Sequence, residues 1–196
     1  GYSNTTGANN VAVGKFALLN NTTASSNTAV GYEALKDNNT SSSQTAIGQQ
    51  ALANITGQYN GGNTAVGQGA GFNQTSGYSN TYVGYNSGYN MTSGIKNTIL
   101  GTYNGNQNGL DIRTSNNNIV LSDGDGNPRL HIDSANTTRI NHVGNIVTAL
   151  NPGALQVKSS GNHNGVKVEI MNESYVAYGS KSTFNGHYYF AYMTNS

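Results

Sequence analysis

The sequence of 196 residues contains no cysteine, few charged residues and no long apolar run. Without cysteine, the chain has neither a disulfide framework nor a thiolate ligand for a metal ion. No stretch of about 18 apolar residues occurs, so the sequence predicts no membrane insertion. The first ten residues lack the basic and apolar regions of a signal peptide. Because the chain opens without methionine just ahead of a repeat, we expect a fragment of a longer protein.

Charge is scarce throughout the chain, at 9% of residues against roughly 25% in typical domains. The net charge is +1 and no basic block occurs, which argues against a nucleic-acid partner, since Lys and Arg must neutralise phosphates. Disordered chains usually combine high net charge with few aromatic residues, whereas this chain has 13 tyrosines. The abundance of Asn, Thr, Ser and Gly therefore predicts an ordered β-rich protein with a neutral polar surface.

A five-residue motif recurs six times in the first half of the chain. Each copy begins with Asn or Gln and ends with an aliphatic residue and glycine: Asn10–Gly14, Asn27–Gly31, Gln44–Gly48, Asn63–Gly67, Asn80–Gly84 and Asn97–Gly101. Successive copies start 17, 17, 19, 17 and 17 residues apart. A fixed period near 20 residues indicates a solenoid, and helical repeats need about 33 residues or more. We therefore predict an all-β fold in which each repeat forms one coil of a parallel β-helix or β-roll.

The strand in each motif has two faces, which we assign from residue type. The aliphatic residues before the glycine share a face with the residue two positions earlier, and we expect this face to point inward. These residues are Val13, Val30, Ile47, Val66, Val83 and Leu100. The intervening residue, usually Ala, is expected to point the other way.

Three other positions of the repeat have expected structural roles. The glycine lets the chain turn with positive φ, and the Asn residues that start the strands stack into an amide ladder. A small or polar residue three positions after the glycine lets a second strand pack closely. These small or polar residues are Ala17, Ala34, Ala51, Ala70, Ser87 and Asn104.

The thin apolar content of each coil predicts association. Each coil offers about four or five apolar side chains, and full burial of one contributes about 1.5–3 kcal/mol. This gain barely offsets an ordering cost of about 1–2 kcal/mol for every backbone residue of the coil. Association about a three-fold axis would bury more surface, so we predict a homotrimer.

Beyond Gly101 the repeat gives way to a different pattern. Leu110 and Ile112, then Ile119 and Leu121, then Leu130 and Ile132 alternate with polar residues, and SDGDGNP is a strong turn signal. This pattern predicts a β-hairpin or meander over 109–133. Further alternation after Asn151-Pro152-Gly153 predicts a small C-terminal β-domain. We expect a repeat shaft at 1–108, a hairpin and linker at 109–151, and a tip or knob at 152–196.

Residues with metal-binding chemistry have simpler explanations. Asp123, Asp125 and Asn127 have the spacing that opens a calcium loop, but Pro128 follows at once and Ser134 stands where the loop needs Glu. A hairpin turn explains them. The four histidines His131, His142, His163 and His187 form no chelating pair within one chain. We interpret them as surface or core residues, with three copies of one histidine on a trimer axis as the alternative, and we predict no metal and no cofactor.

The repeat resembles that of a known group of fibrous proteins. The unit N-T-A-[VI]-G-x-x-A-[LG] is similar to the head repeats of YadA-like trimeric autotransporter adhesins and still more to repeats of phage tail fibre proteins. The segment GLDIRTSNNNIVLSDGDGNPRLHID (Gly109–Asp133) resembles the one that follows such repeats in tail fibres, many of which end in an endosialidase-type intramolecular chaperone. No chaperone segment is visible here. The resemblance implies a homotrimeric fibre on a virion that contacts other tail proteins and binds a glycan or protein receptor on a host cell.

Two alternatives and one candidate site follow from this resemblance. A bacterial adhesin head, placed on the cell surface, would share the repeats. A glycan-depolymerising tailspike would need a site between subunits, because the sequence shows no catalytic pair or triad, and we expect no enzyme. Five tyrosines lie in the last part of the chain, as core or as stacking faces for sugars. The candidate receptor-binding residues are Tyr175, Tyr178, Asn185, His187, Tyr188 and Tyr189.

Overall fold

The computed structural model of the chain describes residues 2–57 and 61–140, which form a parallel β-solenoid of about six turns. This part of the chain contains strands and turns and no helix, so it holds no helix that could cross a membrane. Each coil contributes one short strand to the solenoid: β1 (Val11–Val13), β2 (Thr28–Val30), β3 (Thr45–Ile47), β4 (Thr64–Val66), β5 (Thr81–Val83) and β6 (Thr98–Leu100). The predicted all-β solenoid is confirmed, but the expectation of a second strand in each coil is wrong, because turns take its place in the first five coils. The predicted tip at 152–196 lies outside the described residues.

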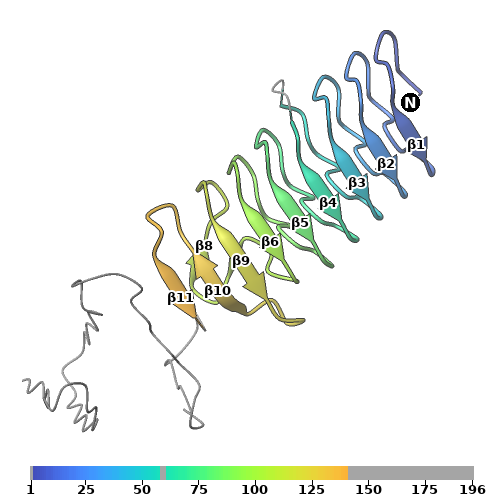
Figure 1. Ribbon diagram of the computed structural model, residues 1–196. Coiled ribbons are helices and arrows are strands. Elements are labelled where there is room, and N and C mark those ends of the chain that lie inside the picture. The colour runs from blue at the N-terminus through green and yellow to red at the C-terminus, as the bar shows by residue number, and fades with distance from the viewer. Residues whose placement is uncertain (1, 58–60, 141–196) are drawn as a thin grey trace, which may run out of the picture. The chain divides into compact units, whose positions relative to one another are not determined.

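One nine-stranded sheet runs along the whole stack of coils (Figure 1). Strands β1 to β6 pair in parallel, with the same repeat position aligned from coil to coil. Strand β9 (Ile119–Ser122) continues the parallel series, and β10 (Pro128–Ile132) and β11 (Thr138–Ile140) add antiparallel strands. The predicted hairpin is therefore present as β9–β10, joined by the SDGDGNP turn. A separate small hairpin pairs β7 (Asn106–Gln107) with β8 (Leu110–Asp111).

The coils bury the face of the strand opposite to the one predicted. The central residues of β2 to β6, which are Ala29, Ala46, Ala65, Tyr82 and Ile99, are 0% exposed. The aliphatic residue that follows each of them is half-buried or exposed, with Ile47 at 41% and Leu100 at 40%. The inward assignment of Val13, Val30, Ile47, Val66, Val83 and Leu100 is therefore wrong. In the first three coils, leucines from the next corner of the coil fill the interior and leave room only for a small residue at the strand centre.

The interior stays closely packed because a large residue at one position is matched by a small residue at the neighbouring position. Leu18, Leu35 and Leu52 are fully buried one residue after the small residue of their coils. In the fourth and fifth coils this place is taken by Gly71 and Gly88. The strand centre is still Ala65 in the fourth coil and becomes Tyr82 in the fifth. A Cβ atom at Gly71 or Gly88 would lie 2.7 or 2.6 Å from the Tyr82 ring. In the fifth coil the pair of alanine and leucine is thus replaced by tyrosine and glycine, and Gly71 of the fourth coil makes room for the same ring, since close-packed interiors tolerate neither voids nor overlaps.

A ladder of amide side chains links the coils at the start of the strands. The side-chain oxygen of each member accepts a hydrogen bond from the backbone N–H of the next member, at 2.9–3.2 Å. The members are Asn10, Asn27, Gln44, Asn63, Asn80, Asn97 and Asn118. Several of the Nδ2 groups also donate to a carbonyl of the loop that closes the coil, as Asn80 does to Gly94 at 2.8 Å. The predicted ladder is confirmed.

The motif glycines adopt a backbone conformation that other residues rarely reach. Their φ angles lie between 106° and 136°. A Cβ atom on any of them would lie 2.2–2.6 Å from a carbonyl oxygen of the next coil. The six positions are Gly14, Gly31, Gly48, Gly67, Gly84 and Gly101. Glycine is therefore required for both the turn and the close stacking, as the sequence predicts.

Candidate functional site

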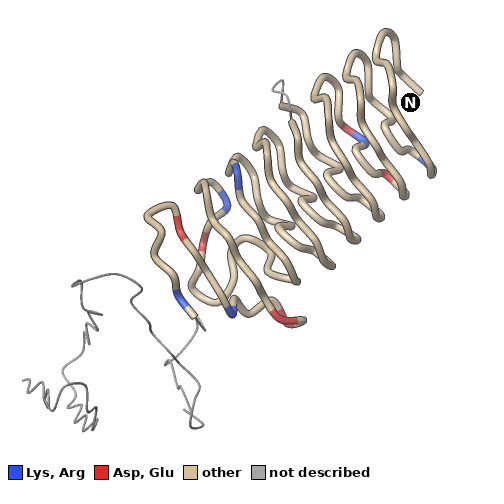
Figure 2. Tube along the Cα trace, in the orientation of Figure 1, with Lys and Arg blue, Asp and Glu red and all other residues tan. Residues whose placement is uncertain are grey.

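The outer face of the sheet carries an apolar surface from its first strand to its last. Strand register places one aliphatic residue per strand in a single row, although the strands change from parallel to antiparallel after β9. This aliphatic row consists of Val13, Val30, Ile47, Val66, Val83, Leu100, Leu121, Leu130 and Ile140. Strands β1 to β6 contain no charged residue (Figure 2). Val13 is 56% exposed and Ile140 is 57% exposed, so residues 2–57 and 61–140 leave much of this row open.

A second surface feature arises at a corner where the sixth coil has one residue fewer than the fifth. The N–H of Gly71 donates to the carbonyl of Ser87, and the N–H of Gly88 donates in the same way to Tyr103, at 2.9 and 2.8 Å. Ser87 stands three residues after its motif glycine, whereas Tyr103 stands only two residues after its own. The sixth coil therefore lacks one residue at this corner, and Tyr103 takes the place predicted for Asn104.

The missing residue leaves the fifth coil uncovered at this corner. In the earlier coils, the second residue after the motif glycine donates its N–H to the preceding coil, as Asn86 does to the carbonyl of Gln68 at 2.9 Å. Within the described ranges, no residue donates in this way to the carbonyl of Tyr85. The result is a hollow of about 250 Å³ beside the sixth coil.

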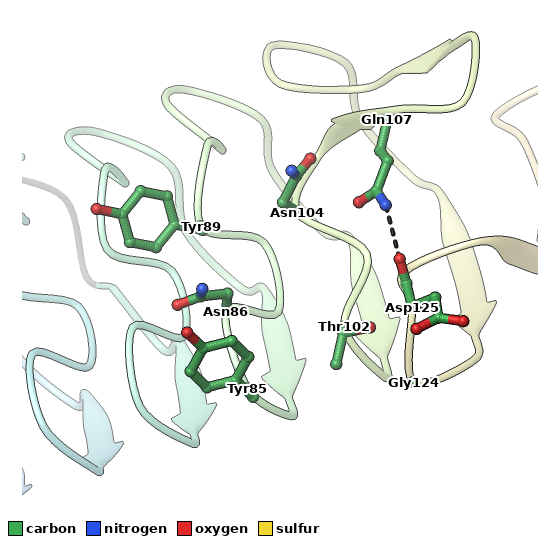
Figure 3. A pocket seen from close by; sticks show the side chains of 8 residues that line it. All are labelled: Tyr85, Asn86, Tyr89, Thr102, Asn104, Gln107, Gly124 and Asp125. Carbon is green, nitrogen blue, oxygen red and sulfur yellow. Dashed lines mark hydrogen bonds between the residues drawn. The ribbon is translucent and has the colours of Figure 1, made fainter.

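Aromatic rings line one side of the hollow and polar side chains line the other (Figure 3). Its lining residues are Tyr85, Asn86, Tyr89, Thr102, Asn104, Gln107, Gly124 and Asp125. The Tyr85 side chain is 58% exposed. The Tyr89 ring stacks on Phe72, with ring centroids 4.9 Å apart and planes inclined by 11°. The hollow thus has one accessible ring and one ring held in place by its neighbour.

The polar side of the hollow is held in place by hydrogen bonds. Gln107 Nε2 donates to the carbonyl of Asp125 at 2.7 Å (Figure 3), and Thr102 Oγ1 donates to the carbonyl of Asp123 at 2.8 Å. Asn104 Oδ1 accepts from the backbone N–H two residues later at 2.9 Å. These bonds join the sixth coil, the β7–β8 hairpin and the β9–β10 turn into one wall.

Other polar groups of the hollow have no partner in the described part of the chain. They are the hydroxyls of Tyr85 and Tyr89, the side-chain amide of Asn86 and the carboxylate of Asp125. The hollow therefore offers hydrogen-bond donors and acceptors beside an aromatic face, with a single negative charge.

The turn between β9 and β10 is organised around Asp123. Its carboxylate accepts hydrogen bonds from the side-chain and backbone N–H groups of Asn127 and from the N–H of Asp125, and it forms an ion pair with Arg129. These bonds, those from Asn127 above all, lower the pKa of Asp123 to about 2. The structure thus accounts for the D-x-D-x-N spacing by a hairpin turn. No group of three or more potential metal ligands occurs among the residues described.

The turn between β10 and β11 repeats this arrangement ten residues later. Asp133 accepts from the N–H groups of Ala135 and Thr137 at 2.9 Å and from Arg139 at 2.7 Å. The bond from Arg139 makes the largest contribution, and together these bonds lower the pKa of Asp133 to about 2. His131, between the two turns, is 3% exposed and its Nε2 lies 3.0 Å from Asn118 Oδ1, so it is a core histidine at the end of the amide ladder.

We expect acid to weaken these two hairpins. Since the folded pKa values of about 2 lie below the unfolded value of about 3.9, the stabilisation is complete above about pH 4 and is lost as the pH falls through about 2. The loss is small because both carboxylates are partly exposed. Thermal unfolding at about pH 5 and pH 2 should show a smaller drop in Tm for an Asp123→Asn, Asp133→Asn variant than for the unmodified chain. Equal drops would contradict this assignment.

The receptor-binding residues predicted from the sequence lie outside the described residues, as do three of the four histidines. These residues are Tyr175, Tyr178, Asn185, His187, Tyr188 and Tyr189, with His142 and His163. Sequence reasoning missed the hollow. The signal that could have found it was the broken repeat after Gly101, next to Tyr85 and Tyr89 of the fifth coil.

No protein-family model matches the chain, and neither a curated protein nor a solved structure does.

Proposed function

We propose that this chain is a segment of a homotrimeric viral tail fibre that acts as a structural and host-recognition element without enzymatic activity. The observation that carries the proposal is the aliphatic row on the outer face of the sheet. Apolar surfaces of this extent on a soluble protein mark interaction sites. The resemblance of the repeats and of Gly109–Asp133 to tail fibre proteins supports the same function.

The partner proposed for the aliphatic row is two further copies of the chain. A rotation axis parallel to the stack brings equal positions of each copy to the same height, so the rows of the copies meet along their whole length. Because strands β1 to β6 themselves contain no charged residue, identical faces of these strands meet without electrostatic repulsion. Three sheets around one axis would enclose the row, and seven parallel strands at about 4.8 Å would form a shaft segment about 30 Å long.

Sedimentation of the full chain tests the trimer. We expect a species of three times the chain mass of 20.5 kDa at micromolar concentration. Ile47→Asp combined with Val83→Asp should shift it to the monomer, because association would bury unpaired charges. Gln49→Asp combined with Gln68→Asp adds the same charge at exposed positions outside the aliphatic row and should leave the trimer intact. A folded monomer of the unmodified chain would refute the trimer.

Host recognition is proposed for the tyrosine-rich segment at the C-terminal end. Its candidate residues, Tyr175, Tyr178, Asn185, His187, Tyr188 and Tyr189, combine aromatic faces with hydrogen-bonding groups, as glycan sites do. We expect removal of residues 154–196 to abolish binding of the labelled protein to host cells, measured by flow cytometry. The β-sheet signal in circular dichroism should persist. Undiminished cell binding by the shortened chain would move the receptor site to the shaft.

A further inference from the structure

We propose that the hollow beside the sixth coil is a lateral binding site for a neutral pyranose sugar, additional to the receptor-binding residues proposed at the C-terminal end. The inference concerns the shaft itself, whereas the proposed function places host recognition at the C-terminal end. It depends on the shortened corner of the sixth coil.

The two tyrosines supply a surface suited to the apolar face of a sugar ring. Tyr85 is 58% exposed, so its ring is free to receive a ligand. Tyr89 stands four residues later on the same side of the hollow, and its stacking on Phe72 at 4.9 Å limits its movement. Rigid aromatic side chains contribute large contact areas at a low cost in conformational entropy, and their hydroxyls add hydrogen bonds at the rim.

The unpartnered polar groups fit the hydroxyls of a sugar. The carbonyl of Tyr85 and the carboxylate of Asp125 accept hydrogen bonds, and the Asn86 amide both accepts and donates. Within the described residues none of these groups is used by the fold. A ligand that offers several hydroxyl groups around an apolar ring would satisfy them on both sides of the hollow.

The charge and size of the hollow narrow the class of ligand. Asp125 is the one charged side chain in the lining, and its negative charge disfavours phosphates and acidic sugars. The volume of about 250 Å³ is below the range of about 300–1,000 Å³ that is typical of drug-sized ligands. One neutral sugar unit, as part of a longer glycan that continues into solvent, therefore fits the hollow best.

The chain contains a matched tyrosine that lacks the hollow. Tyr32 follows its motif glycine as Tyr85 does, and it is 41% exposed. The stack is uninterrupted there, because Gln50 donates its N–H to the carbonyl of Tyr32 at 2.7 Å and its side chain to Glu33 at 2.8 Å. Comparing Tyr32 with Tyr85 therefore separates the effect of the hollow from that of an exposed tyrosine ring at the same repeat position.

The test titrates the full chain with the methyl glycosides of glucose, galactose, mannose and N-acetylglucosamine, and with that of N-acetylneuraminic acid as an acidic probe. Binding is measured by saturation-transfer NMR at millimolar concentration. We expect at least one neutral glycoside to bind. Tyr85→Ala should weaken its affinity about tenfold, as expected for the loss of an aromatic contact, and Asp125→Asn should also weaken it. Tyr32→Ala should leave it unchanged.

Three results would overturn the site: no neutral glycoside binds, Tyr85→Ala binds as tightly as the unmodified chain, or the acidic glycoside binds best. Circular dichroism of each variant shows whether the fold is retained, which we expect because Tyr85 and Tyr32 are exposed. The proposed function is judged by sedimentation and cell binding instead, so its failure would leave the sugar measurement intact and the reverse also holds.

Discussion

Replacement of Gly48 by alanine is expected to disrupt the coil stack, with a loss of about 2–6 kcal/mol in the free energy of unfolding. Gly48 has a φ of 136°, a region that costs other residues about 1–3 kcal/mol. Its new Cβ would also lie 2.4 Å from the carbonyl oxygen of Gly67, and overpacking of this kind costs about 1–3 kcal/mol. Denaturant titration followed by far-ultraviolet circular dichroism measures the loss.

The position of Gly48 in the middle of the stack increases the effect of the substitution. Each coil of a solenoid contacts only its neighbours, so a disrupted interface separates the coils on either side of it. We therefore expect the unfolding transition of Gly48→Ala to broaden as well as to shift. Measurement at several wavelengths should reveal two partly separate transitions in place of one.

Two other glycines separate the conformational cost from the steric one. A Cβ atom at Gly109 or Gly124 would meet nothing within 4 Å, and only Gly109 has a positive φ, of 78°. Gly109→Ala should therefore cost about 1 kcal/mol, and Gly124→Ala should be close to neutral. If Gly48→Ala were as stable as Gly124→Ala, the result would contradict the close stacking described for the motif glycines.

The features that the sequence predicts well are those that recur at the repeat period. The spacing of the six motifs predicts the solenoid, because a regular period requires equivalent residues to stack. Asn27 and Asn63 illustrate the same point for the amide ladder, in which each side chain serves the next coil. The β9–β10 hairpin is predicted because its turn contains the residues that such turns prefer, and Asp123 then organises that turn.

The inward face of the strand could not be assigned from alternation alone. Alternation shows that Thr45 and Ile47 share one face and Ala46 the other, but not which face is buried. Residue hydrophobicity favours the aliphatic side, whereas Leu52 and its equivalents leave space for alanine only. The fifth coil held a clue, because Tyr82 occurs at the strand centre only where Gly71 and Gly88 replace leucine. Size exchange of this kind indicates that the three positions share one interior.

The hollow depends on a feature that a search for repeats ignores, namely a missing residue. The expected small residue of the sixth coil was counted from the motif glycine to Asn104, whereas Tyr103 is the residue that stacks on the fifth coil. Tyr103 takes the inward place that Ser87 and the alanines hold in the earlier coils, and it is fully buried. Its hydroxyl donates to the carbonyl of Leu110 at 2.7 Å, which anchors the β7–β8 hairpin beside the hollow.

Ala46→Asp should prevent the coil stack from folding, whereas Ile47→Asp should leave each chain folded and weaken association only. Ala46 is 0% exposed at the centre of β3, between Ala29 and Ala65 in the neighbouring strands. A carboxylate there would be buried without a partner, and the cost of several kcal/mol approaches the total stability of a typical domain. Ile47 is 41% exposed, so its replacement places the charge at the surface of the single chain. Circular dichroism gives the β-sheet content, and sedimentation gives the mass.

A milder pair of substitutions decides the orientation of the strand if both aspartate variants fail to fold. Ala46→Leu adds three carbon atoms in a place where Leu35 and Leu52 occupy the positions that glycine takes around Tyr82, so it should cost about 1–3 kcal/mol. Ile47→Leu conserves volume at a half-exposed position and should cost less than about 1 kcal/mol. The reverse order of melting temperatures, with Ile47→Leu the less stable variant, would show that the aliphatic row faces the coil interior after all.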